Sequence, residues 1–206
     1  MADQSHPSES PEEHKLRAMR VTAAARFNAA HRLRRHERAS LFSISFSSLA
    51  VVIISMLEPF GVTLSVPAGA VNLSMAGVSL IILVMSLLIS GRKYGERAEQ
   101  MHQGAVEINA ISRRLATAVS KGDAAAVEQL SEDYEAVLKV HENHEHLDYR
   151  VATIRRYSDF YKIARKDRVL CWVSSQLDVA HHLLPLLAVI GFLAYLLNGA
   201  CIECGS

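Results

Sequence analysis

The residues best suited to chemistry lie in one short segment, HENHEH at residues 141–146, which is followed by Asp148. Imidazole and carboxylate groups at helical spacing can hold zinc, hydrogen-bond to each other or titrate near neutral pH. The metalloprotease pattern HExxH is absent, because Glu145 stands where the second histidine is required. We favour a buried polar network that fixes the register of packed helices. On a continuous helix His144 and Asp148 are one turn apart and can hydrogen-bond directly. A metal site, a ligand contact and a proton-sensitive switch are the alternatives. The candidate residues of this network are His141, Asn143, His144 and Asp148.

Other patterns that support catalysis or nucleotide binding are missing from the sequence. No nucleophile–base arrangement, phosphate-cradling glycine loop or spaced ligand set appears, so we expect no enzyme activity, cofactor or metal. The formal net charge of +1 argues against direct nucleic-acid binding. The basic stretch from Arg150 to Arg168 has aromatic residues between its cations, which is typical of a helix that enters a membrane from the cytoplasm. Cys201 and Cys204 share only the spacing of a redox pair, and a disulfide staple or no role at all is the simpler interpretation.

The distribution of cations indicates how the chain is organised. All 22 Lys and Arg residues fall between Lys15 and Arg38 or between Arg92 and Arg168. A soluble domain spreads its cations over its whole surface, so two long cation-free regions need a cause. Insertion of these regions into a bilayer is the simplest one.

Two uncharged stretches, Ser40–Leu57 and Ala68–Ser90, are predicted to cross the membrane as a helical hairpin. Crossing about 30 Å of hydrocarbon takes about 20 helical residues, and both stretches are close to that length. Basic residues precede the first stretch and follow the second, whereas the connecting loop has none. The positive-inside rule therefore places both basic ends and the N-terminus in the cytoplasm.

The remaining segments are predicted to be helical as well. Residues 1–12 are polar and are expected to be disordered, and residues 13–39 have the apolar spacing of a basic amphipathic helix. The region 91–178 is expected to form cytoplasmic helices: a seam from Tyr94 to Val119 precedes a break at Gly122, with Asp123 as cap. A second amphipathic run from Val127 to Val151 then returns antiparallel to the first.

Residues 179–206 contain a third apolar run, Leu183–Ile202. Its basic approach and cation-free tail predict a crossing with the C-terminus outside, and a re-entrant or interfacial helix is the alternative. The predicted fold class is therefore all-α: an integral membrane hairpin (residues 40–90), a cytoplasmic antiparallel helical layer and a third C-terminal transmembrane helix.

Small polar residues follow one face of each hairpin helix. These candidate pore-lining or packing residues are Ser43, Ser47, Asn72, Ser79 and Ser86. Such side chains let helices approach closely and hydrogen-bond across the contact, which favours plain helix packing. They can also line an aqueous path when several copies align these faces. The spans contain no charged residue, which argues against a proton relay or voltage sensor.

The layout resembles the SLATT family, which comprises bacterial two-transmembrane effectors associated with nucleotide-signalling defence systems. The resemblance covers about His31 to Arg156 and is strongest for the branch numbered five, in which an Asn-His followed by Asp-Tyr recurs. Here these pairs are Asn143-His144 and Asp148-Tyr149. The third apolar run departs from the two spans in the family's name.

The resemblance implies a homo-oligomeric effector that senses the product of a partner enzyme, a reverse transcriptase or a nucleotide synthase, and then breaches the membrane. Growth arrest or cell death of an infected cell follows. The alternative is a non-conducting membrane anchor or scaffold that recruits a cytoplasmic partner such as a reverse transcriptase. The lipid bilayer is a partner in both cases.

Overall fold

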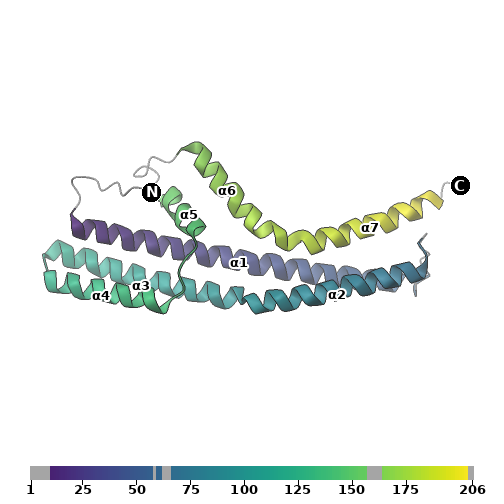
Figure 1. Cartoon of the computed structure of the whole chain (residues 1–206), viewed down its shortest axis with the longest axis horizontal. Helices are drawn as coiled ribbons and strands as arrows, with labels where there is room; N and C mark the ends of the chain where they lie inside the picture. The colour runs from purple at the N-terminus through teal and green to yellow at the C-terminus, as the bar shows by residue number, and fades with distance from the viewer. Residues whose placement is uncertain (1–9, 58, 62–65, 157–163, 204–206) are drawn as a thin grey trace. The chain divides into compact units, whose positions relative to one another are not determined.

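Every element in the described part of the chain is a helix (Figure 1). The computed structural model describes residues 10–57, 59–61, 66–156 and 164–203. The prediction of an all-α fold is therefore confirmed. The elements are α1 (Pro11–Leu57), α2 (Ala68–Arg92), α3 (Tyr94–Lys121), α4 (Ala124–Val140), α5 (His146–Arg156), α6 (Arg165–Ala180), η1 (His181–Leu183) and α7 (Leu184–Glu203).

Some of the sequence predictions fall outside the described residues. They concern the tail before Ser10, residues 157–163 of the basic stretch, and Cys204.

Helix α1 joins the basic amphipathic segment to the first apolar stretch without a break. Its start is fixed by a capping box, in which the Glu13 backbone N–H donates to Ser10 Oγ at 3.2 Å and the Ser10 N–H donates to Glu13 Oε2 at 3.0 Å. Pro11 suits the first helical position, where a missing N–H costs nothing. The helix ends at Leu57, two residues before Pro59.

A single residue separates α2 from α3. Lys93 adopts the left-handed conformation, with φ 49° and ψ 42°, and its N–H donates to the Ser90 carbonyl. A residue in this conformation ends one helix before the next begins. The second predicted span therefore ends close to the expected Ser90, and the seam helix begins at Tyr94.

The α3–α4 hairpin follows the predicted pattern. Gly122 has a positive φ of 69°, and Asp123 caps α4 by accepting a hydrogen bond from the Ala126 N–H at 3.1 Å. The predicted seam is buried: Ile108 and Leu115 of α3 pack with Met19 of α1 in one apolar cluster. Partly buried residues of α4 complete this cluster, namely Val127, Leu130, Tyr134, Val137 and Leu138.

The prediction of one amphipathic helix from Val127 to Val151 is wrong. Helix α4 ends at Val140, and His141 adopts an extended conformation with φ −99° and ψ 145°. Within the segment that follows, the Asn143 side chain accepts a hydrogen bond from the His144 N–H at 3.0 Å. Asparagine side chains compete with helical hydrogen bonds in this way, so the HENHEH segment forms a connection and α5 starts only at His146.

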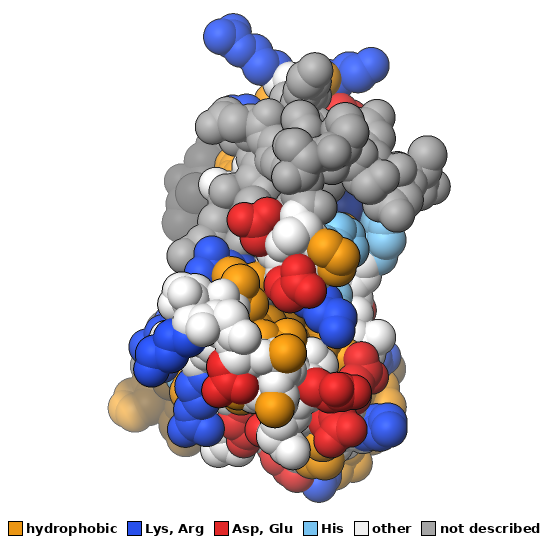
Figure 2. Space-filling view, turned by 90° about the vertical axis from the view of Figure 1, so that its left-hand side faces the viewer, with side chains coloured by type: hydrophobic (Ala, Val, Ile, Leu, Met, Phe, Trp, Pro, Cys, Tyr) orange, Lys and Arg blue, Asp and Glu red, His pale blue; other side chains and the backbone are white. Residues whose placement is uncertain are grey.

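The chain forms two compact units. Unit 1 comprises residues 1–34 and 95–175, and unit 2 comprises residues 35–94 and 176–206. Figure 2 views the molecule from the left-hand side of Figure 1 and shows acidic and basic side chains interspersed there. Charges of both signs next to each other are typical of a surface that faces water.

Unit 2 contains the apolar hairpin, and little of its surface is covered within the chain. In α2 only Val71 and Met75 are buried, and they pack with Ile54 of α1. Three helices among the described residues are long and apolar enough to cross a membrane, and the third spans Arg165–Phe192. The fold therefore includes a C-terminal candidate for a third membrane helix, which overlaps the predicted run Leu183–Ile202 in its first half.

Candidate functional site

The polar residues that the sequence singles out lie in unit 1, where they contact residues of α1 and α3. Near the end of α4, the Nε2 atom of His141 lies 3.2 Å from Glu107 Oε2. Asn143 shapes the connecting segment through its hydrogen bond to the His144 N–H. The ring of His144 stacks on Tyr149, with ring centroids 6.1 Å apart.

Asp148 is the best satisfied member of this group, and its principal partner is Arg32. The Arg32 Nε and Nη2 atoms donate to the two carboxylate oxygens, each at 3.0 Å, and Asp148 is fully buried. Arg32 also lies 2.9 Å from the Glu145 carboxylate. A two-pronged guanidinium–carboxylate pair fixes geometry as well as charge. The pair therefore fastens the start of α5 to α1.

The predicted His144–Asp148 hydrogen bond is not the arrangement found. Asp148 directs its carboxylate to Arg32 and to the Glu145 N–H, and His144 Nδ1 is buried with no hydrogen-bond partner. Burial lowers the pKa of the His144 imidazole, and the nearby Arg26 lowers it further, against an opposing effect of Asp148. His144 is therefore held in its neutral form.

A second ion pair connects the segment to α3. Arg97 donates to both oxygens of Glu142, at 3.0 and 2.6 Å. Hydrogen bonding to Arg97 lowers the pKa of Glu142. The connection between α4 and α5 is thus tied down at Glu142 as well as at Asp148.

Arg26 is the most unusual residue of the site. It is only 1% exposed, and its Nε and Nη1 atoms have no hydrogen-bond partner among the described residues. Burial lowers the pKa of its guanidinium. A buried charge is normally paired, because an unpaired one costs several kcal/mol. Electrostatic interactions with Tyr134 and Glu107 offset part of this cost.

Gly104 of α3 makes the space that Arg26 occupies. A Cβ atom at this position would lie 2.6 Å from Arg26 Nη1 and 3.0 Å from His141 Cγ. A side chain there would displace the guanidinium, the ring or both. The absence of a side chain at Gly104 thus brings Arg26 and His141 together.

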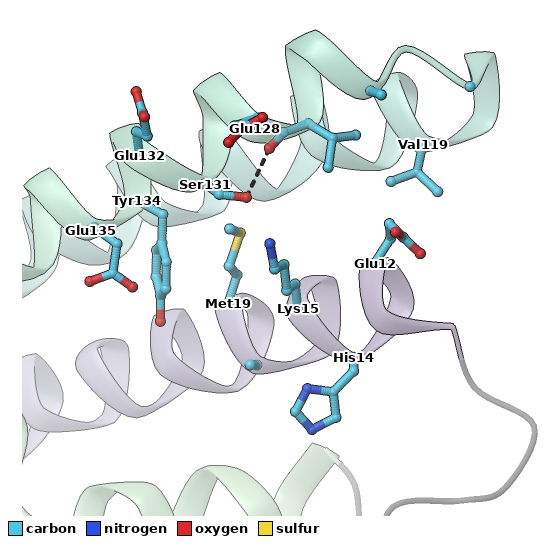
Figure 3. A pocket seen from close by; sticks show the side chains of 14 residues that line it. Glu12, His14, Lys15, Met19, Val119, Glu128, Ser131, Glu132, Tyr134 and Glu135 are labelled. Carbon is cyan, nitrogen blue, oxygen red and sulfur yellow. Dashed lines mark hydrogen bonds between the residues drawn. The ribbon is translucent and has the colours of Figure 1, made fainter.

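An open groove with different chemistry lies elsewhere in unit 1 (Figure 3). It has a volume of about 850 Å³ and lies between the start of α1 and α4. Four glutamates line it together with only two basic side chains, His14 and Lys15. Such a lining repels anions and suits a basic partner. The glutamates are Glu12, Glu128, Glu132 and Glu135.

The candidate pore-lining or packing residues of unit 2 divide into two groups. Ser43 and Ser47 of α1 are completely buried within the chain, and their hydroxyls have no partner among the described residues. On α2, Asn72 and Ser79 are exposed and Ser86 is partly exposed. The two helix faces therefore differ: the serine face of α1 packs within one chain, whereas the polar face of α2 is open to the surroundings.

Sequence reasoning missed the two arginines at the centre of the unit 1 site. Arg26 lies three residues after Ala23 and four before Ala30, so it stands within the apolar stripe of α1. A charged residue in such a stripe is a signal that could have identified it. For Arg32 no comparable signal exists, because its partner Asp148 lies 116 residues away in the chain.

A comparison with known families identifies the chain's family. A family profile described as "SMODS and SLOG-associating 2TM effector domain family 5" matches residues 8–197, which is most of the chain. This is the branch that the sequence resemblance indicates. Neither the curated proteins nor the solved structures contain a significant match.

Proposed function

The chain belongs to family 5 of the SMODS and SLOG-associating 2TM effector domains, and from this premise we propose that it is a signal-gated membrane effector of a bacterial defence system. Several copies assemble in the inner membrane with their N-termini in the cytoplasm. A signal from a partner enzyme, a reverse transcriptase or a nucleotide synthase, opens the assembly. The breached membrane then arrests growth or kills the cell, and the protein itself catalyses no reaction.

The polar face of α2 is the observation that carries this proposal. Asn72 and Ser79 are exposed on a helix whose large apolar neighbours, such as Leu73 and Leu80, are exposed too. In hydrocarbon a polar side chain is costly unless it finds a hydrogen-bond partner, and membrane helices find such partners on each other. Since the chain leaves this face open, further copies supply the contact. Several α2 helices arranged in this way form a weakly polar wall that water can wet.

Arg26 supplies a means of gating the assembly. An anionic signal that pairs with its guanidinium removes the cost of an unpaired buried charge. A ligand that binds the open arrangement better than the closed one shifts the population toward it. A shift from about 1% to 99% open requires roughly 5.5 kcal/mol of differential binding. Several subunits share this binding free energy. Helix α1 belongs to both units, and it carries the conformational change from the Arg26 site to the membrane hairpin.

Bulky substitutions on the α2 face test the proposal. In cells that express the partner system, activation should depolarise the membrane, as reported by a potential-sensitive dye. We expect the double variant Ser79→Leu/Ser86→Leu to abolish depolarisation, because leucine closes the polar wall. Ser55→Leu, the same change at an exposed serine of α1, is the control and should depolarise normally. An unchanged dye response in the double variant contradicts a pore lined by α2.

A non-conducting scaffold is the second candidate function, and the acidic groove of unit 1 favours it. The groove between the start of α1 and α4 suits a basic segment of a cytoplasmic partner (Figure 3). In this case the membrane potential stays intact while the partner system is active. The partner should co-purify with the wild-type chain and be lost when Glu128 and Glu132 are changed to lysine.

A further inference from the structure

Three histidines of unit 2 gather at a place that neither the polar network nor the α2 face involves. Each offers a ring nitrogen, and these atoms all lie within 4.8 Å of one another. His36 and His182 are each only 4% exposed, whereas His181 is exposed. The three residues are His36 of α1 and His181 and His182 of η1.

Proline explains why two of these histidines lie in a tight turn. Pro185 has no N–H, so the His181 carbonyl cannot receive the usual helical hydrogen bond from four residues ahead. It accepts instead from the Leu184 N–H, three residues ahead, which is the 3₁₀ pattern of η1. Local sequence therefore fixes the turn from His181 to Leu183 at the start of the third apolar helix.

The neighbours of His36 hold its ring in the tautomer that binds metals. Its Nε2 atom lies 2.9 Å from Asp178 Oδ2, so Nε2–H donates to the carboxylate. The Nδ1 lone pair then points to His182 Nε2, 2.9 Å away. Tyr94 stacks on the ring, with centroids 5.3 Å apart. A carboxylate behind an imidazole is the usual outer support of a metal-binding histidine.

The hydrogen bonds within the cluster leave one buried nitrogen unsatisfied. His182 donates its Nε2–H to His36, and its Nδ1 atom is buried without a partner among the described residues. An ion between the rings binds His36 Nδ1 and His182 Nε2 in place of this hydrogen bond. The proton that His182 carried on Nε2 moves to its unpartnered Nδ1, so both imidazoles stay neutral.

We infer that His36, His181 and His182 form a binding site for a transition-metal ion of the zinc class, with Asp178 as the outer-shell residue. Imidazole nitrogens suit zinc, copper, iron and nickel, whereas magnesium and calcium require oxygen ligands. Tetrahedral zinc holds nitrogen ligands at about 2.0–2.1 Å, so they lie roughly 3.3 Å apart. His36 and His182 must open slightly from 2.9 Å, and the offered His181 nitrogen lies within 4.8 Å of both. A water molecule completes the fourth position.

The ion connects two apolar helices near their cytoplasmic ends. His36 precedes the first predicted span, and His181 and His182 directly precede the third apolar run. A metal bound to all three fastens the start of α7 to α1. It thereby couples the additional C-terminal helix to the hairpin. Exposed His181 provides the route by which the ion enters from water.

Cobalt binding to the purified full-length protein tests the site. The protein is prepared in detergent with a histidine-free affinity tag, stripped with EDTA and titrated with Co²⁺, whose visible absorption reports tetrahedral coordination. We expect about one ion per chain, displaced by one equivalent of Zn²⁺, and a rise in the thermal midpoint with either ion. His36→Gln and His182→Gln should abolish the absorption, and Asp178→Asn should weaken binding by about 10-fold to 100-fold.

Two controls separate this site from other histidines in the chain. His31→Gln changes an exposed histidine of α1, and His144→Gln/His146→Gln removes two imidazoles of the HENHEH segment. Both should bind Co²⁺ like the wild type. The inference is overturned if the wild type shows no tetrahedral cobalt spectrum. It is equally overturned if His144→Gln/His146→Gln, and not His36→Gln, removes the spectrum.

Discussion

The two units expose opposite kinds of residue. In unit 1, Ile108 and Leu115 of α3 are fully buried, and the surface carries charges of both signs. In unit 2, α2 is apolar almost throughout, yet Ile81 is 58% and Leu87 66% exposed. Apolar surface that faces outward is unfavourable in water and favourable in hydrocarbon. The same chain therefore contains one part folded for water and one part folded for lipid.

Both units bury polar groups, but these groups differ in charge. Unit 1 buries the charged Arg26 and Asp148, whereas unit 2 buries serines of α1 and the imidazoles of His36 and His182 and leaves Asn72 exposed. In a water-facing unit a buried charge is an expensive feature that needs a structural or ligand-binding reason. In a membrane-facing unit an exposed polar face needs a neighbouring helix. Matched substitutions in the two units test this difference.

Arg32→Met should have the largest effect on stability. It leaves the Asp148 carboxylate buried without its guanidinium, and such a loss costs about 3–5 kcal/mol. Arg34→Met is the matched control, because its pair with Glu99 is exposed and is worth no more than about 1 kcal/mol. Thermal or denaturant unfolding in detergent measures both. Equal losses of stability in Arg32→Met and Arg34→Met would show that Arg32 does not hold Asp148 as the geometry indicates.

Ile108→Ala and Ile81→Ala compare the same deletion in the two units. Ile108 is fully buried, so its truncation should lower the free energy of unfolding by about 2–5 kcal/mol. Ile81 loses only contacts with lipid or detergent, and we expect a loss below about 1 kcal/mol. A large loss of unfolding free energy for Ile81→Ala in detergent would indicate that this face of α2 lies in a packed interface. Such a result would support assembly of several copies.

Arg26→Met should change stability only slightly and in the opposite direction. Methionine fills the space without a buried charge, so the free energy of unfolding should rise by roughly 1 kcal/mol. The same variant should lose signal-dependent depolarisation, since the anion has no guanidinium to bind. Arg20→Met, at an exposed position of α1, should alter neither property. A destabilised Arg26→Met would instead identify Arg26 as a structural residue.

Local sequence was enough to place most helix ends in both units. The Asp123 cap, the break at Gly122 and the end of the second span all depend on residues next to each other in the chain. The connection at residues 141–145 is the exception. Its hydrophobic spacing continued the helical pattern, and the competing hydrogen bond of Asn143 carried a weaker signal than the periodicity.

By itself the sequence determined that this protein is helical, membrane-inserted and related to two-transmembrane effectors, because hydropathy, cation placement and periodicity are properties of contiguous residues. Only the tertiary structure decided which polar residues meet. It brought Arg32 to Asp148 and His36 to His182, pairs separated by 116 and 146 positions. No repeat or spacing encodes such encounters. They follow from how helices pack, and packing is settled by the whole set of side chains at once.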